Sequence, residues 1–387
     1  MIDTYGRNDV TLTLSPDELN TRWGYLDEII KNRDLDAILV VGNSSVGPGV
    51  YGSFRYFTNH KVYYGYQAIV ARPGKPIMVC ASSFLHEKAL TLKGFKDIRL
   101  APDIRGSVLA RLSEQPVRRL GVSLGVLPAS WYLELEKMNV EFVDINDDIA
   151  VYRSRRSEYE LACTRESARI SEVGYKAMLD MAKPGVRMSD LHTHLDYVMK
   201  MAGAEETFTL MSCGRFSLED NHLPCIHAYA WPDENVINHG DNIGMEITPR
   251  YQGYWTQMVR TICVGEANPD LEAVHKAQID TIAAAIKLLK PGVRLEDVLT
   301  YIFEFAKDIG YIAKLPSCHI GGIDLDEGWH YSFDSDIVLK ENMTFILHPT
   351  LVTPKIDYGI YWGESYLVTK DGGVCLSFSG DDLPVVL

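Results

Sequence analysis

A segment of fifteen residues occurs twice in the second half of the chain, and this repeat limits the folds that the chain can adopt. Residues 177–191 and 284–298 match, and both contain Lys-Pro-Gly-Val-Arg. In each copy a helical pattern ends at Pro-Gly, and a second helix follows that runs to Met199 or Phe305. Two copies are too few for a solenoid. The repeat therefore predicts one duplicated domain with approximate two-fold symmetry.

The first part of the chain has the pattern of an α/β domain. Ser15 can cap a helix that runs to about Asn32, and the apolar residues 35–41 predict a buried strand. Residues 68–79 read as a hairpin around Arg-Pro-Gly-Lys. The basic residues 153–156 then open a long helical stretch. We expect an amino-terminal domain over residues 1–152 and a second domain over residues 153–387.

Composition indicates a globular protein that acts on small molecules. The chain has 387 residues, 46% of them hydrophobic, and a net charge of −14, which disfavours nucleic acid and anionic membranes as partners. No apolar run reaches the roughly 18 residues of a membrane span, and the amino terminus lacks a signal pattern, so a cytoplasmic location is expected. The seven dispersed cysteines include no Cys-x-x-Cys pair, which favours free thiols.

Five polar residues in the last third of the chain stand in short strand-like phrases: Glu246, Gln257, His319, His348 and Glu364. Their order and phrasing resemble the pita-bread hydrolases, the family of creatinase, prolidase, aminopeptidase P and methionine aminopeptidase. Residues 54–59 are also similar to a phrase in the amino-terminal domain of creatinase and prolidase. The resemblance implies an α/β amino-terminal domain, then a pita-bread domain of two αβ halves with pseudo-two-fold symmetry around a central site, and a homodimer.

The resemblance also shows a departure at the metal site. In the metallopeptidases of the family these five positions read Asp, Asp, His, Glu, Glu and hold two divalent cations. Here Gln257 and His348 replace two of the four carboxylates, and two carboxylates balance a charge of +4 poorly. We therefore expect no metal pair and no cofactor. The alternative is one ion, Fe, Zn or Mn, on the other members of the set, Glu246, His319, His348 and Glu364.

A second departure concerns catalytic histidines. Asp326 stands where the peptidases of the family carry a His that assists peptide cleavage, so we expect Xaa-Pro hydrolysis to have been lost. Creatinase uses a His general base instead of metals. His227 is the candidate here, although the family spacing to Pro232 points to Tyr229, and His222 and His239 compete with it.

Aromatic residues near these positions suggest the kind of substrate. Trp255, Trp362 and Tyr229 flank the site phrases, together with further tryptophans and tyrosines. Aromatic faces beside Glu246 and Glu364 would hold a small cation, although core packing explains any single aromatic residue equally well. Gln257 and Asp326 complete the expected substrate-binding set.

The leading prediction is a hydrolase that cleaves a non-peptide C–N bond, in an amidine, cyclic amidine or amide, as in creatinase and ectoine hydrolase. Water or Glu246 would attack the carbon, His227 or His319 would move protons, and Glu364 would bind the cationic nitrogen, with His348 in the same set. Three alternatives stay open. They are a single-metal hydrolase, lyase or oxygen-dependent enzyme, an Xaa-Pro dipeptidase or aminopeptidase, and a binding module without catalysis.

Overall fold

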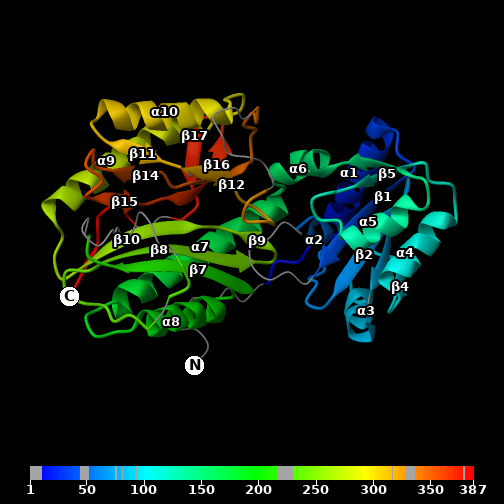
Figure 1. Cartoon of the computed structure of the whole chain (residues 1–387), viewed down its shortest axis with the longest axis horizontal. Helices are drawn as coiled ribbons and strands as arrows, with labels where there is room; N and C mark the ends of the chain where they lie inside the picture. The colour runs from blue at the N-terminus through cyan, green and yellow to red at the C-terminus, as the bar shows by residue number, and fades with distance from the viewer. Residues whose placement is uncertain are drawn as a thin grey trace. The chain divides into compact units, whose positions relative to one another are not determined.

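The computed structural model describes residues 11–43, 52–74, 76–80, 82–92, 94–216, 230–232, 234–315, 317–327, 336–377 and 380–387. Within these residues the chain forms two compact units (Figure 1). One comprises Leu12–Ser154 and a short segment that begins at Asp326, and the other comprises Arg155–Leu325 and a later segment that ends at Leu387. Each unit is considered by itself below. His227 and Tyr229 lie outside the described residues.

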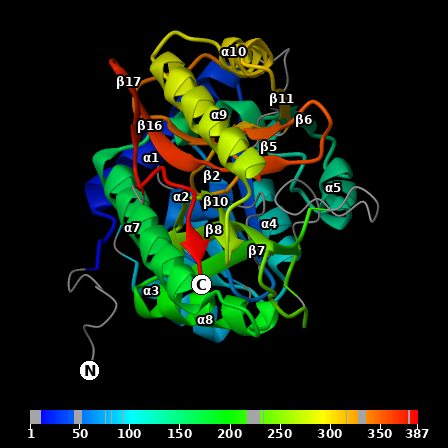
Figure 2. The same cartoon turned by 90° about the vertical axis from the view of Figure 1, so that its left-hand side faces the viewer.

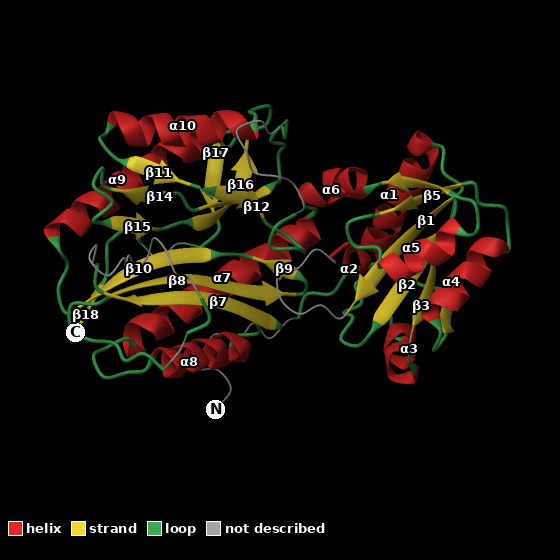
Figure 3. Cartoon of the chain, viewed as in Figure 1, coloured by secondary structure: helices red, strands yellow, loops and turns green. Residues whose placement is uncertain are grey.

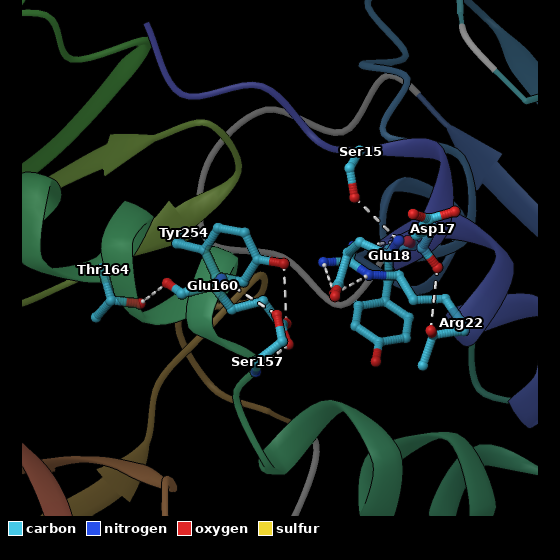
Figure 4. A network of polar contacts seen from close by, with 10 residues as sticks. Ser15, Asp17, Glu18, Arg22, Ser157, Glu160, Thr164 and Tyr254 are labelled. Carbon is cyan, nitrogen blue, oxygen red and sulfur yellow. Dashed lines mark hydrogen bonds and ion pairs between the residues drawn. The ribbon is translucent and has the colours of Figure 1, made fainter. Parts of the chain in front are cut away.

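The amino-terminal unit is a mixed six-stranded sheet with helices around it, in the strand order β4-β3-β2-β1-β5-β6. Its core contains Leu39, Val70, Val122 and Trp131. The side chain of Ser15 accepts a hydrogen bond from the backbone N–H of Glu18, which confirms the predicted helix start (Figure 4). The elements are α1 (Pro16–Arg33), β1 (Ala37–Asn43), α2 (Gly52–Thr58), β2 (Tyr66–Ala71), β3 (Ile77–Cys80), α3 (Ser83–Leu90), β4 (Ile98–Leu100), α4 (Ile104–Ser113), β5 (Arg119–Val122), α5 (Ala129–Glu136), β6 (Glu141–Asp144) and α6 (Asn146–Ser154).

The second unit has two helix pairs, α7–α8 and α9–α10, on opposite sides of its strands (Figures 1 and 2). Its strands form three sheets, β18-β10-β8-β7 with β9 on β8, β11-β14-β15, and β12-β13-β16-β17 (Figure 3). The elements are α7 (Glu158–Met181), α8 (Met188–Met201), β7 (Glu206–Gly214), β8 (Asn242–Tyr251), β9 (Tyr254–Trp255), β10 (Met258–Val264), α9 (Pro269–Ala285), a 3₁₀ turn (Ile286–Leu288), α10 (Leu295–Asp308), β11 (Ile312–Lys314), β12 (Cys318–Ile320), β13 (Thr344–Leu347), β14 (Thr350–Val352), β15 (Gly359–Tyr361), β16 (Glu364–Thr369), β17 (Gly372–Cys375) and β18 (Val385–Val386).

The two Pro-Gly turns of the repeat have the same backbone structure. Gly185 and Gly292 have φ angles of +91° and +92°, a region that glycine occupies without the steric cost of a side chain. Their N–H groups donate to the carbonyls of Ile237 and Leu339, each at 2.9 Å. Those two residues donate back to Val186 and Val293. The duplication predicted from the sequence is therefore confirmed down to individual hydrogen bonds.

Helix α7 begins at a buried capping box that also fixes the β8–β9 turn. The hydroxyl of Ser157 accepts from the N–H of Glu160, and the Glu160 carboxylate accepts from the N–H of Ser157. The same carboxylate accepts a hydrogen bond of 2.9 Å from the Tyr254 hydroxyl (Figure 4). The start of α7 and the turn before Gln257 are therefore held together.

Strand β8 points Glu246 away from α7. Side chains alternate along a strand, and a Cβ atom placed on Gly174 of α7 would lie 3.2 Å from the side chain of Ile247. Ile247 therefore faces α7, and its neighbour Glu246 faces the opposite side of the sheet. Glu246 is only partly buried, whereas Met245 and Ile247 are fully buried.

Two further sequence predictions concern membranes and thiols. Among the described residues, no helix is both long and apolar enough to cross a bilayer. The six cysteines in the described part of the chain are all free, as expected.

Candidate functional site

Four of the five predicted positions belong to two hydrogen-bonded groups, Gln257 with His319 and Glu246 with Tyr361 and His348, which meet at neighbouring histidine rings and together are called the network below. Glu246 comes from β8, Gln257 precedes β10, His319 lies in β12 and His348 follows β13. The rings of His319 and His348 lie with their centroids 5.2 Å apart. The sequence therefore located a real cluster, built from strands of both halves of the second unit.

His319 is held between a backbone carbonyl and an amide. Its Nδ1 lies 3.0 Å from the carbonyl oxygen of Leu325, and its Nε2 lies 3.2 Å from Oε1 of the Gln257 side chain. Burial lowers the pKa of His319 to about 4, so the ring is neutral at pH 7. A carbonyl can only accept, so Nδ1 carries the proton and Nε2 presents a lone pair. An amide oxygen cannot satisfy that lone pair, so we assign the Gln257 amide with its oxygen and nitrogen exchanged, so that the NH₂ group donates to Nε2.

His348 is linked to Glu246 through a tyrosine. Its Nδ1 lies 3.1 Å from the hydroxyl of Tyr361, and that hydroxyl lies 2.9 Å from Oε1 of Glu246. Burial, together with the neighbouring His319, lowers the pKa of His348 to about 3. The site therefore contains two neutral imidazoles at pH 7.

Glu364, the fifth predicted position, has different partners. Its two carboxylate oxygens contact the guanidinium of Arg260 and the hydroxyl of Ser377. Arg260 is buried and its guanidinium carbon lies 4.2 Å from the ring centroid of Trp362. Burial raises the pKa of Glu364, and Arg260 offsets part of that rise. The carboxylate is thus engaged in a buried ion pair.

Two aromatic residues that the sequence predicts to bind substrate lie in the core instead. Trp255 and Trp362 are each 2% exposed and belong to the core. Trp255 packs with Leu325 and Ile346, and the ring of Trp362 lies between Arg260 and His275. Their faces are covered by protein side chains, so the expectation that they form a substrate-binding surface receives no support from their position.

The other predicted residues are placed as follows. Asp326 follows Leu325 in the chain, and burial raises its pKa. His239 is exposed and lines a surface pocket of about 410 Å³ with Arg215 and Tyr358. Across the described residues, no three His, Cys, Asp or Glu side chains are gathered as they would be around a metal ion.

Sequence reasoning missed the residues that connect the site. Tyr361, Arg260 and Ser377 each contact a predicted residue directly. Arg260 follows Gln257 by three residues and Tyr361 precedes Glu364 by three, so both stand inside the phrases that carry the pattern. This closeness in sequence to the predicted residues was the signal that could have identified Tyr361 and Arg260. It does not show which side chains contact each other.

Comparisons with known proteins identify the family. The profile of metallopeptidase family M24 matches residues 162–370, and that of the creatinase/prolidase N-terminal domain matches residues 22–155. The chain belongs to metallopeptidase family M24. As a member of this family it is a hydrolase that acts on a C–N bond.

Similar proteins support the same fold. An uncharacterized peptidase of Bacillus subtilis, YqhT, is 21% identical over 91% of this chain and 96% of its own length. An Xaa-Pro dipeptidase of Pyrococcus furiosus is 27% identical over 61% of this chain and 67% of its own length. The crystal structure of a prolidase from Pyrococcus horikoshii matches with a TM-score of 0.82 at 21% identity, covering 94% of this chain and all of that one. The predicted architecture of an α/β domain followed by a pita-bread domain is thereby confirmed.

The contact between Arg260 and Glu364 predicts a specific pattern of stability. Arg260→Met should lower the free energy of unfolding by about 3–5 kcal/mol, because it leaves a buried carboxylate without its partner. Adding Glu364→Gln should recover part of that loss, measured by urea unfolding. Arg250→Met is the matched control, since Arg250 also pairs with carboxylates and lies 5.2 Å from a tryptophan ring but is partly exposed, so it should cost less. A double variant no more stable than Arg260→Met would contradict the buried pair.

The neutral histidines predict that stability depends on pH. In the unfolded chain a histidine takes up a proton near pH 6.5, whereas His319 and His348 do so near pH 4 and 3 in the folded protein. The unfolded state therefore binds more protons between these values, and stability falls as the pH is lowered from 6.5 towards 4. His348→Gln should flatten that slope by up to about 1.4 kcal/mol per pH unit. Urea unfolding at pH 7, 6 and 5 measures it. His239→Gln, at an exposed histidine, is the control and should not change the slope of unfolding free energy against pH. An equal effect of both variants would contradict the assignment of His348 as a buried neutral histidine.

Proposed function

We propose that this chain hydrolyses a non-peptide C–N bond in a small cationic molecule, an amidine, cyclic amidine or amide, without a pair of metal ions. The observation that carries the proposal is the contact between Gln257 and Nε2 of His319. A two-metal peptidase of this family needs a carboxylate at position 257 and an imidazole at position 319 whose lone pair faces a cation. Here an amide takes the lone pair.

The remaining contacts also fit a metal pair poorly. Both oxygens of Glu364 are occupied by Arg260 and Ser377. A metal would have to displace a charged guanidinium that is itself 1% exposed. Moreover Gln257 and His348 are uncharged, so the five positions supply only two carboxylates against a charge of +4. This supports hydrolysis by the side chains of the chain itself.

Charge at the site favours a cationic substrate. Glu246 is partly exposed, and the two imidazoles beside it are neutral, so no histidine charge repels a cation. In this proposal Glu246 activates water or attacks the carbon directly. Direct attack by a carboxylate is reasonable where the carbon is activated, as in a protonated amidine, because the positive charge increases its electrophilicity.

An Xaa-Pro dipeptidase is the second candidate, and the comparisons favour it. Two relatives that match 61% and 66% of this chain are named as Xaa-Pro dipeptidases. An Xaa-Pro dipeptidase of this family needs bound metal, and here the metal ligands would include Gln257 and His348 in place of two carboxylates. The two candidates therefore differ in metal content and in substrate, and both differences can be measured.

Metal content separates the candidates first. Protein purified without chelator should contain fewer than two divalent ions per chain by elemental analysis, because the donor set lacks two carboxylates. The double variant Gln257→Asp/His348→Glu restores the family's charge and should gain bound manganese. Two ions per chain in the unmodified protein would contradict the proposal, and one ion would favour the single-metal enzyme.

Substrate tests separate them next. A panel of amidines, cyclic amidines and small amides should contain a molecule that is hydrolysed, and Glu246→Gln should abolish that turnover while leaving the fold unchanged by circular dichroism. The change preserves volume and removes only the charge needed for attack. Gly-Pro and Ala-Pro with added manganese serve as the peptidase control. Cleavage of these dipeptides at rates typical of enzymes, about 1 per second or faster, would show that the dipeptidase reading is correct instead.

A further inference from the structure

We propose that Tyr361 relays a proton between His348 and Glu246, so that the three side chains act as one base. The inference rests on the proposed function in that Glu246 and His348 serve the reaction. Tyr361 does not act on the substrate itself in this scheme. It is a positioning and relay residue.

The geometry leaves Tyr361 a single arrangement when Glu246 is ionised. The hydroxyl lies within hydrogen-bond distance of Oε1 of Glu246, at 2.9 Å, and of Nδ1 of His348, at 3.1 Å. A hydroxyl has one proton to donate, and a carboxylate can only accept, so the proton of Tyr361 goes to Glu246. Nδ1 of His348 must then donate to the tyrosine oxygen. His348 is therefore fixed as the Nδ1–H tautomer, and its Nε2 carries the lone pair.

This arrangement allows a balanced proton transfer. As a water molecule attacks the substrate, one of its protons bonds to Nε2 of His348. The Nδ1–H bond breaks and that proton passes to the oxygen of Tyr361, whose own proton passes to Oε1 of Glu246. The imidazole ends neutral as the Nε2–H tautomer, Tyr361 keeps one proton, and Glu246 gains one. Reversal of the same steps returns the proton to the leaving nitrogen.

The relay resolves a difficulty with His348 as a base. His348 is 2% exposed, so a positive charge on its imidazole would be poorly solvated. Through Tyr361 the imidazole never has to hold a second proton, because the charge that is neutralised belongs to Glu246. The carboxylate supplies the basicity, and the imidazole supplies the nitrogen that receives the proton.

The backbone around Tyr361 is held independently of its hydroxyl. Thr261 donates its hydroxyl proton to the carbonyl of Tyr361, at 3.0 Å, and β15 pairs with β14 through Tyr361 and Thr350. Tyr361→Phe removes only the oxygen that bridges Glu246 and His348. We therefore expect this variant to fold, and its effects to report on the relay.

The tautomer of His348 is the first readout, and it needs no substrate. Nitrogen-15 NMR of histidine side chains at pH 7, with His348 assigned through His348→Gln, should show the Nδ1–H form in the unmodified protein. Tyr361→Phe should shift His348 to the Nε2–H form or to a mixture. Tyr254→Phe is the matched control, because Tyr254 also donates its hydroxyl to a buried glutamate, Glu160, but lies outside the network. An Nε2–H tautomer in the unmodified protein, or no change in Tyr361→Phe, overturns the proposal.

Kinetics give the second readout, with the hydrolysed member of the substrate panel. In mixtures of H₂O and D₂O, kcat of the unmodified enzyme should vary with deuterium content along a curve, because several protons move together. Tyr361→Phe should lower kcat at least tenfold with little change in KM and make the dependence linear. In Tyr254→Phe the dependence of kcat on deuterium content should stay curved. If the dependence of kcat on deuterium content is still curved in Tyr361→Phe, the relay is overturned. If no panel member is hydrolysed, the proposed function fails while the NMR result still decides the hydrogen-bond arrangement.

Discussion

The contact between β10 and the start of β16, called the seam here, joins the two halves of the duplicated domain, and the site depends on it. Val259 and Gly363 exchange backbone hydrogen bonds, and the Ser365 hydroxyl bonds to both backbone groups of Gln257. The buried pair of Arg260 and Glu364 lies beside these contacts. Because each half alone carries only part of the network, the halves must meet in one register for His319 to reach Gln257 and for Tyr361 to reach Glu246. Charge burial at the seam makes any other register costly, since it would leave Arg260 or Glu364 unpaired.

Local patterns explain why much of the fold could be predicted. The Ser15 cap, the hairpin of β2 and β3 and the paired Pro-Gly turns are each determined by neighbouring residues, and each occurs where the sequence indicated it. The repeat extended this local information to a whole domain, because two similar sequences in one chain favour two similar structures. The family phrases then located Glu246, Gln257, His319 and His348 in one network. None of these steps required knowledge of long-range contacts.

The rest could not be predicted because it depends on which side chains meet across the halves. Tyr361 reads as one more aromatic residue in the sequence, yet its hydroxyl links residues that are 115 and 13 positions away. Trp362 and Trp255 read as substrate-binding residues, yet both lie beneath guanidinium groups in the core. Periodicity assigns a face to a side chain, but tertiary packing decides whether that face meets solvent, a ligand or an arginine. The pairing of Glu364 with Arg260 is likewise a consequence of packing.

The network also shows how a metal-binding scaffold can remain ordered with fewer carboxylates. An imidazole lone pair inside a protein needs a donor, whether a cation or an N–H group, because an unsatisfied polar atom is costly to bury. At His319 an amide from Gln257 meets this need, and at Glu364 the guanidinium of Arg260 supplies the positive charge. Carboxylates at positions 257 and 348 would have had to be neutralised, whereas an amide and a neutral imidazole require no counter-charge. The two substitutions thus act together, since each removes one negative charge from a cluster that already contains Glu246 and Glu364. In the proposed function, a single partly exposed carboxylate beside two neutral rings acts on a substrate that brings its own positive charge.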